Sequence, residues 1–356
     1  MKKHNFSAGP AILPASVLQK ASEAVIDLNG IGLSILEISH RSKEFIAVLD
    51  RSVELVKSLY QVPDDYAVLF LSGGASTQFF MSAMNLLDDS GKAAYVDTGS
   101  WSSKAIKEAK QFGTVEVIAS SKDKNYTYIP TGYAVPQDAT YLHLTSNNTI
   151  FGTQFRTFPK TTVPIVCDMS SDVFSRQIDI NQFGMIYAGA QKNMGPAGTT
   201  LVIIRKDLLG KVNRTIPSML QYQIHIDQDS CYNTPPVYPI YVSMLTMEWI
   251  EEMGGLPVME AQNKLKAEKM YQAIDSNPLF EGTVRPEDRS WMNATFILKD
   301  GSLESLFLKE CDAAGISGLK GHRSVGGFRA SIYNAMPLES IGVLTDLMDS
   351  FAQKHG

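Results

Sequence analysis

Short apolar runs alternate with helical patterns from about residue 66 onward, and this alternation constrains the fold more than any other feature of the sequence. Residues 66–71 predict a buried strand, residues 72–77 a Gly-Gly turn and residues 78–87 a helix. A second unit follows, with a strand at 93–96 and good helix formers up to Lys110. Such repetition is typical of a mostly parallel sheet flanked by helices, so the predicted fold class is α/β.

Four further apolar runs are bounded by Gly, Pro, Asn and Asp residues, which favour turns. They are residues 140–144, 163–167, 185–187 and 200–204. Their unbroken hydrophobicity differs from the alternation of a half-exposed strand, and it predicts strands that are buried on both faces. We expect these strands to extend the same sheet.

A domain boundary is predicted at Gly254-Gly255, because glycine ends helices and the following Pro257 favours the start of a new one. Beyond it, the pattern predicts helices at 258–274, 303–314 and from Pro337 onward, with strands at 292–298 and 327–333. We therefore expect three parts. These are an N-terminal extended segment at 1–15 that packs near the active site, a large domain at 16–256 and a small C-terminal α/β domain at 257–356.

The net charge and the cysteines limit the kinds of partner and compartment. A formal net charge of -5 argues against broad nucleic-acid binding. Cys167, Cys231 and Cys311 form no CxxC pair, which is typical of a reducing compartment, and the histidines lack metal-binding spacing, so no metal is expected. No apolar run approaches the roughly 20 residues that cross a bilayer, and Pro10 and Pro14 interrupt the only candidate leader. We expect a cytoplasmic protein without a membrane partner.

Two charged residues are placed where they can carry chemistry. Lys192 lies in a Gly/Pro-rich loop between two apolar strands, where confinement and desolvation lower the pKa of an amine and favour Schiff-base formation. Asp168 directly follows the strand at 163–167, at the sheet edge where open α/β sheets bind ligands. Beside a pyridine nitrogen, such a carboxylate stabilises the protonated ring. Taken singly, an ordinary surface turn is the favoured interpretation of Lys192, and a turn or helix cap suits Asp168 as well as a functional role does.

Three other segments follow predicted strands. The turn Gly73-Gly74-Ala75-Ser76-Thr77 opens a helix, and its free N–H groups and hydroxyls favour phosphate, although it lacks the Gly-Lys-Ser/Thr of a Walker loop. Trp101 offers an indole face to a planar heterocycle, with core packing as the alternative. Asn147-Asn148-Thr149 supply polar side chains at the same edge, or form a simple turn.

Basic residues gather in two places in this acidic chain. Residues 313–338 contain no Asp or Glu but carry Lys320, His322, Arg323 and Arg329 among glycines. A smaller cluster lies at residues 39–43. Because the planar guanidinium fork suits carboxylate and phosphate groups, the interpretation is a binding site for an anionic ligand, with a solvated surface as the alternative.

In combination, these features resemble the phosphoserine aminotransferases, a family of class V pyridoxal-phosphate-dependent aminotransferases with the fold type I, aspartate-aminotransferase-like architecture. The resemblance covers nearly the whole chain. Five separate blocks carry it in the right order, namely residues 5–14, 39–45, 187–193, 233–236 and 321–337.

The resemblance implies a role for each candidate residue. Lys192 would form the Schiff base with pyridoxal 5'-phosphate, Asp168 would pair with the pyridinium nitrogen, and both would be catalytic. Trp101 would stack on the ring and Thr149 would contact its phenolic oxygen. The cofactor phosphate would be held by Ala75, Ser76 and Gln191, joined by Asn233 and Thr234 from the other subunit of a homodimer with shared active sites. The substrate phosphate would be bound by His40, Arg41, His322 and Arg323, and the substrate carboxylate by Arg329.

The implied reaction moves an amino group from glutamate to 3-phosphohydroxypyruvate in a ping-pong cycle, giving 2-oxoglutarate and phosphoserine for serine biosynthesis. A second candidate substrate is 3-hydroxy-2-oxo-4-phosphooxybutanoate, on the route to pyridoxal phosphate itself. Some family members have an arginine at the position of Ser76, so we expect a different anion cage. Two other functions stay open, a lyase of the same fold such as a cysteine desulfurase and a non-catalytic phosphometabolite-binding protein. A desulfurase needs a mobile reactive cysteine, which Cys167 and Cys311 do not resemble.

Overall fold

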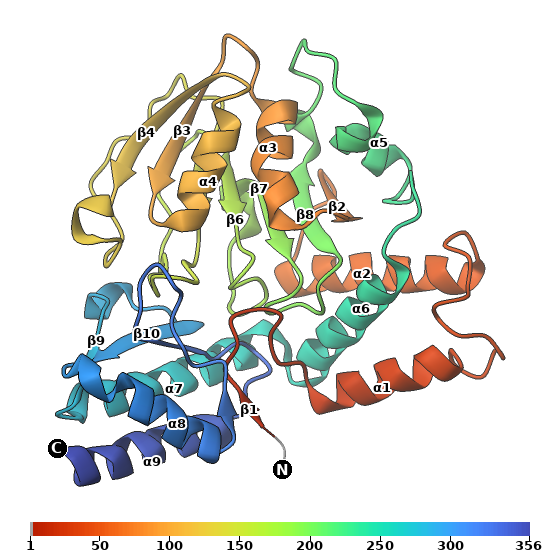
Figure 1. Ribbon diagram of the computed structural model, residues 1–356. Coiled ribbons are helices and arrows are strands. Elements are labelled where there is room, and N and C mark those ends of the chain that lie inside the picture. The colour runs from red at the N-terminus through yellow and green to blue at the C-terminus, as the bar shows by residue number, and fades with distance from the viewer. Residues whose placement is uncertain (1–2) are drawn as a thin grey trace.

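The main sheet lies in the upper half of the molecule in Figure 1, a computed structural model that describes residues 3–356. Within these residues it has seven strands in the order β2-β8-β7-β6-β5-β3-β4. Their bounds are β2 Tyr66–Leu71, β3 Lys92–Asp97, β4 Thr114–Ser120, β5 Leu142–Thr145, β6 Ile165–Asp168, β7 Phe183–Gly189 and β8 Thr200–Arg205. β8 pairs antiparallel with β2 and β7, and the other pairs are parallel. The predicted mostly parallel sheet is confirmed.

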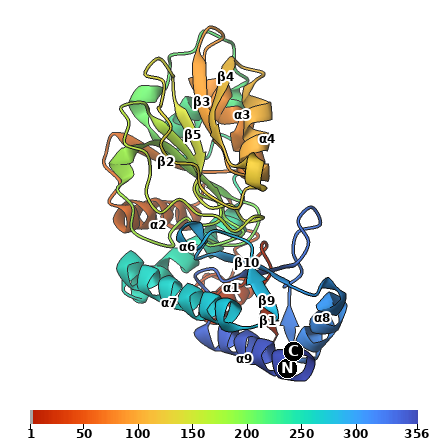
Figure 2. The ribbon, with the colours of Figure 1, turned by 90° about the vertical axis from the view of Figure 1, so that its left-hand side faces the viewer.

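Helices cover both faces of this sheet because successive residues of its strands are apolar. On β2, Val68 and Phe70 belong to one hydrophobic cluster, and Leu69 and Leu71 belong to another. The first cluster includes residues of α1 (Ala15–Ile26), α2 (Lys43–Tyr60) and α6 (Val237–Glu252), and the second those of α3 (Gly74–Leu86), α4 (Ser100–Ala109) and α5 (Tyr222–Asp227). Figure 2 shows α3 and α4 on one side of the sheet and α2 on the other. The continuous apolar runs therefore reflect burial on two faces.

A smaller antiparallel sheet lies below the main one, in the order β12-β10-β9 (Figure 1). Its strands are β9 Phe280–Gly282, β10 Asn293–Leu298 and β12 Phe328–Ser331, and it packs with α7 (Gly255–Ser276), α8 (Glu304–Ala313) and α9 (Leu338–His355). Five phenylalanines form the centre of a separate hydrophobic cluster, Phe280, Phe296, Phe307, Phe328 and Phe351. The division of the chain at residue 257 stays a prediction.

The N-terminal segment joins this smaller part of the structure. β1 (His4–Asn5) pairs in parallel with β11 (Ile316–Ser317), and Phe6 is fully buried in the cluster of the small sheet. The segment then runs toward the main sheet, since Ala11 N–H donates to the carbonyl of Gln191 at 2.9 Å. It therefore connects the two sheets.

Several elements differ from the expectation, and α1, α2, α5 and α6 were not predicted. α3 begins at Gly74 rather than at residue 78, because Gly73 takes a left-handed φ of 99° at the helix start and Thr77 Oγ1 donates to its carbonyl at 2.9 Å. β4 was not predicted. It is an edge strand with mostly exposed or half-exposed side chains, so its hydrophobic signal is weak. No helix among residues 3–356 combines the length and the hydropathy that crossing a membrane requires.

Candidate active site

Five of the predicted site residues lie at one edge of the main sheet. Ala75 follows β2, Trp101 follows β3, Thr149 follows β5, Asp168 ends β6 and Lys192 follows β7. These strands all run in the same direction, because β2 and β7 are each antiparallel to β8. Their carboxyl ends therefore meet where open α/β sheets bind ligands.

Lys192 is held at the centre of this edge. Its Nζ donates to Thr149 Oγ1 at 2.8 Å and lies 5.6 Å from the centre of the Trp101 ring. Burial lowers the pKa of Lys192 to about 8. The negative charge of Asp168 opposes this shift, and the positive charge of Arg329 adds to it. A larger share of the amine is consequently neutral and nucleophilic than for an exposed lysine.

Asp168 is buried, and only one of its two carboxylate oxygens accepts hydrogen bonds from residues 3–356. Its Oδ1 accepts hydrogen bonds from Ser170 N–H at 2.9 Å and from Ser170 Oγ at 2.6 Å, while Gly189 N–H donates to Ser170 Oγ at 3.1 Å. Burial raises the pKa of Asp168, although Lys192 and the Ser170 hydrogen bonds oppose this rise. Within residues 3–356 its Oδ2 has no hydrogen-bond partner, so one carboxylate oxygen is free for a ligand.

The Gly-Gly turn forms the N-terminal end of α3. Ala75 is partly buried and Ser76 is exposed, so backbone N–H groups of this first turn are accessible. A cavity of about 170 Å³ is lined by Gly73 and Thr77 of this turn and by Asn233. The predicted phosphate turn and Asn233 therefore share one region of the molecule.

A hairpin brings the basic residues His322 and Arg323 to the same edge. Residues 318–327 rise from the small sheet toward the main sheet in Figure 1, and Gly321 N–H donates to the Gly327 carbonyl at 2.8 Å. Val325 of this hairpin packs, together with Trp101, against a small cluster of Tyr126, Ile150 and Phe151. His322 and Arg323 are thereby carried next to the Trp101 side of the site.

Arg329 completes this side of the site from β12. Its Nη1 donates to the carbonyl of Thr149 at 3.4 Å. Its Nε is buried and has no hydrogen-bond partner among residues 3–356. Burial lowers the pKa of Arg329. Because an unsatisfied buried donor is costly, this guanidinium is placed to bind an anion.

His40 and Arg41 are not brought to this edge in the way that Arg329 is. They lie in the segment between α1 and α2, at the right-hand side of Figure 1, away from the carboxyl end of β7. Burial raises the pKa of Cys231 and the charge of Arg41 opposes the rise, which places Arg41 near Cys231. Arg41 and the adjacent pair Asn233-Thr234 therefore belong to one surface region.

The chain matches known proteins over its whole length. Residues 3–344 match the family described as aminotransferase class-V. A phosphoserine aminotransferase of Flavobacterium psychrophilum is 58% identical over 355 residues, covering 99% of this chain and 100% of the relative. One of Parabacteroides distasonis is 56% identical and covers both chains completely. The chain belongs to the class V aminotransferases, within the phosphoserine aminotransferase family.

Solved structures agree with this assignment. The phosphoserine aminotransferase of Bacillus circulans subsp. alkalophilus has a TM-score of 0.97 at 47% identity, covering 100% of this chain and 99% of its own. A pyridoxal-phosphate-bound phosphoserine aminotransferase from Trichomonas vaginalis has a TM-score of 0.93 at 39% identity, covering 98% of this chain and 100% of its own. The predicted aspartate-aminotransferase-like, fold type I architecture is confirmed.

The residues present fit the cofactor of the class V aminotransferases, pyridoxal 5'-phosphate. The site combines an amine of lowered pKa on Lys192, a free carboxylate oxygen on Asp168 and an indole face on Trp101. The first turn of α3 adds accessible backbone N–H groups that suit a phosphate. An aldehyde, a ring nitrogen, an aromatic face and a phosphate on one ligand match these four features.

Three supporting residues of this aminotransferase were not predicted. Ser170 orients Asp168, Tyr333 OH donates to the Ala8 carbonyl at 2.7 Å, and Asn193 Oδ1 accepts the Asn334 N–H at 3.0 Å. The spacing Asp-x-Ser is typical of an Asx-turn, so Ser170 had a local signal. The other two pairs are far apart in sequence and had none.

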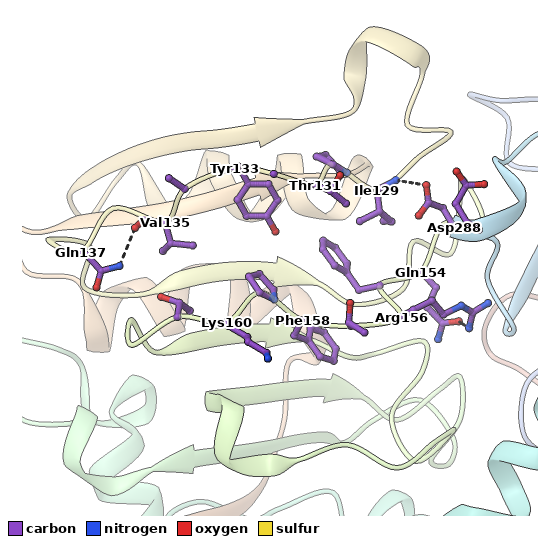
Figure 3. A pocket seen from close by; sticks show the side chains of 18 residues that line it. Ile129, Thr131, Tyr133, Val135, Gln137, Gln154, Arg156, Phe158, Lys160 and Asp288 are labelled. Carbon is purple, nitrogen blue, oxygen red and sulfur yellow. Dashed lines mark hydrogen bonds between the residues drawn. The ribbon is translucent and has the colours of Figure 1, made fainter.

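A separate cavity lies away from this site. It has a volume of about 470 Å³ and lies between segments 129–137 and 154–161 (Figure 3). Asp288 lies at one end, where its Oδ2 accepts the Ile129 N–H at 3.1 Å. None of the predicted site residues lines it. This cavity is therefore no part of the candidate active site.

Proposed function

We propose that this chain is a pyridoxal-phosphate-dependent transaminase that moves the amino group of glutamate to 3-phosphohydroxypyruvate, giving phosphoserine and 2-oxoglutarate. The observation that carries the proposal is the placement of Lys192 and Asp168 at one sheet edge beside unpaired cationic side chains. Full-length similarity to phosphoserine aminotransferases supports the choice of substrates. The route through 3-hydroxy-2-oxo-4-phosphooxybutanoate stays a prediction.

The side chains divide the work of the reaction. When bound, pyridoxal 5'-phosphate supplies an aldehyde for covalent attachment and a protonated ring that stabilises carbanion charge. With the cofactor bound, Lys192 Nζ would take the proton from the substrate Cα, a role that its lowered pKa suits. Asp168 Oδ2 keeps the ring nitrogen protonated, and Ser170 fixes the orientation of the carboxylate.

The remaining residues bind and orient. Trp101 would stack on the cofactor ring, and Thr149 would contact the ring's phenolic oxygen next to Lys192. Ala75, Ser76 and Gln191 would hold the cofactor phosphate. Arg329 takes the substrate carboxylate, because its guanidinium lies beside Thr149 with a free donor. His322 and Arg323 take the substrate phosphate together with His40 and Arg41.

A spectroscopic half-reaction tests the function. Phosphoserine alone is added to the cofactor-loaded protein, and the visible absorption is followed. A transaminase shows a lasting spectral change that 2-oxoglutarate reverses, because the amino group stays on the enzyme until an acceptor arrives. A lyase returns to its starting spectrum without an acceptor, and a binding protein shows no lasting change. Either of these two outcomes contradicts the proposal.

The cysteines argue against the lyase alternative. Cys167 and Cys311 are buried, and burial raises the pKa of both thiols. Burial also raises the pKa of Cys231. A persulfide-forming cysteine needs an accessible thiol with a lowered pKa, which none of the three provides. Free thiols agree with the proposed cytoplasmic location.

We infer that the active form is a homodimer with shared sites. Six of the large apolar side chains that are exposed among residues 3–356 lie within residues 18–46. Two more, Met219 and Tyr232, are exposed in the part of the chain that includes Asn233. The six are Leu18, Ile26, Ile31, Leu33, Leu36 and Ile46. An apolar surface of this kind favours burial against a second copy. In such a dimer, the partner supplies Arg41 to the site of Lys192, whereas Asn233 lines a cavity with Gly73 and Thr77 of its own chain.

Subunit complementation tests the sharing. Lys192→Ala and Arg41→Ala proteins are each assayed at low phosphoserine and then after mixing and exchange of subunits. Hybrid dimers carry one intact site, so about a quarter of wild-type activity returns at equal amounts. If the mixed proteins are shown to be dimers but regain no activity at any mixing ratio, Arg41 serves the site of its own chain.

A further inference from the structure

Lys104 lies at the mouth of the candidate active site without a partner. It is an exposed residue of α4, three positions after Trp101, and its Nζ lies 4.5 Å from the centre of the Trp101 ring. Among residues 3–356 it forms no ion pair and no hydrogen bond. Its neighbour Lys107, on the same helix, is exposed but makes no contact with Trp101.

The hairpin places further positive charge beside Lys104. The pKa of His322 is lowered by burial and then by the charges of Arg329, Arg323 and Lys104, so three positive charges act on one ring. None of these three cations forms an ion pair with a carboxylate in the described part of the chain. Trp101 and Val325 pack on one cluster, which keeps α4 and the hairpin together. Like charges held this close repel each other unless an anion lies between them.

We propose that Lys104 is a specificity residue that binds the phosphate group of the phosphorylated substrate. The inference rests on the proposed function, in which the substrate carries a carboxylate at one end and a phosphate at the other. In that function Arg329, whose Nη1 donates to the Thr149 carbonyl, binds the carboxylate end. Lys104 faces the hairpin instead, and the first turn of α3 offers the uncharged Ser76. Lys104 therefore supplies a cation that this turn lacks.

Half-reactions with two amino donors test the role. Lys104→Met keeps the length of the side chain and its contact with Trp101 but removes the charge. The KM for phosphoserine rises about tenfold with kcat nearly unchanged, because one charge-assisted contact to the phosphate is lost. The KM for glutamate rises less, by about threefold at most, because its side-chain carboxylate carries one negative charge and phosphate carries nearly two. Lys104→Arg restores most of the affinity, and Lys107→Met behaves as wild type.

Two results of these half-reactions would overturn the inference. One is a phosphoserine KM that is the same in Lys104→Met and Lys107→Met. The other is an equal loss for phosphoserine and glutamate, which would assign Lys104 to the support of Trp101 rather than to a phosphate.

Inorganic phosphate provides a readout that does not depend on turnover. Its binding to the cofactor-loaded protein is measured by calorimetry, and we expect about tenfold weaker binding by Lys104→Met than by wild type or Lys107→Met. Equal binding overturns the inference. If wild-type protein fails to convert phosphoserine, the proposed function fails, while the phosphate titration still decides whether Lys104 binds phosphate.

Discussion

The centre of the site and its rim are built in different ways. At the centre, Lys192 donates to Thr149 at 2.8 Å, and Asp168 accepts from the Ser170 hydroxyl at 2.6 Å. Asp168 ends β6 and Lys192 follows β7, so both are attached directly to the sheet. At the rim, Lys104 and Arg323 are exposed and unpaired in the described chain. The groups proposed for chemistry are therefore positioned before any ligand arrives. The groups proposed for the substrate phosphate depend on the ligand to offset their repulsion.

The strongest test of this comparison is Lys192→Ala. We expect turnover to fall by about 10⁴-fold or more, because no other amine among residues 3–356 donates to Thr149 beside Asp168. The half-reaction with phosphoserine measures the loss, and thermal unfolding checks that the fold is kept. Lys160→Ala, at the separate cavity, serves as the control. Turnover near the wild-type value in Lys192→Ala would refute the assigned role.

Arg329→Ala tests the boundary between the two regions. We expect the KM for both amino donors to rise about 100-fold, since a partly buried cation with a free donor loses its carboxylate partner. The affinity for pyridoxal 5'-phosphate, measured by fluorescence titration, should stay within about twofold. Equal losses of substrate and cofactor affinity would count against the assignment.

Ser170→Ala tests whether orientation matters at the centre. The substitution removes the 2.6 Å hydrogen bond to Asp168 Oδ1 and leaves the Gly189 N–H without its acceptor. We expect kcat to fall about tenfold with little change in KM, because the effect passes through Asp168. Ser276→Ala, on the exposed end of α7, is the matched control. A rise in KM at constant kcat would place Ser170 among the binding residues instead.

The smallest effect concerns pH. Because the pKa of Lys192 is lowered to about 8, its neutral fraction increases as the pH rises through that value. We expect the rate at which cofactor-free protein takes up pyridoxal 5'-phosphate to rise about fivefold between pH 7 and pH 8 and then to level off. Stopped-flow absorption measures this rate. A profile that keeps rising to pH 10 would show an amine exposed to water.

The centre could be predicted from the sequence more fully than the rim. Lys192, Asp168, Trp101 and Thr149 each follow an apolar run, and parallel strands bring such positions to one edge whatever the details of packing. Lys104 had no comparable signal. Its proximity to His322 depends on a contact between α4 and a hairpin more than 200 residues later in the chain.

The position of Arg41 shows another limit. The sequence groups it with His40 as a basic cluster, and the fold places Arg41 near Cys231. Residues that serve a neighbouring subunit look like any other surface residues in a single chain. Local patterns therefore indicate their chemistry but not the site that they serve.

The pairing of β1 with β11 sets the order in which the enzyme can be completed during synthesis. His4 finds its partner strand only when Ile316, more than 300 residues later in the chain, has been synthesised. Until then, Ala8 has no Tyr333 hydroxyl to hold it, and the segment that reaches the Gln191 carbonyl is tethered at one end only. The loop of Lys192 is thus enclosed only after the residues up to Tyr333 have been translated.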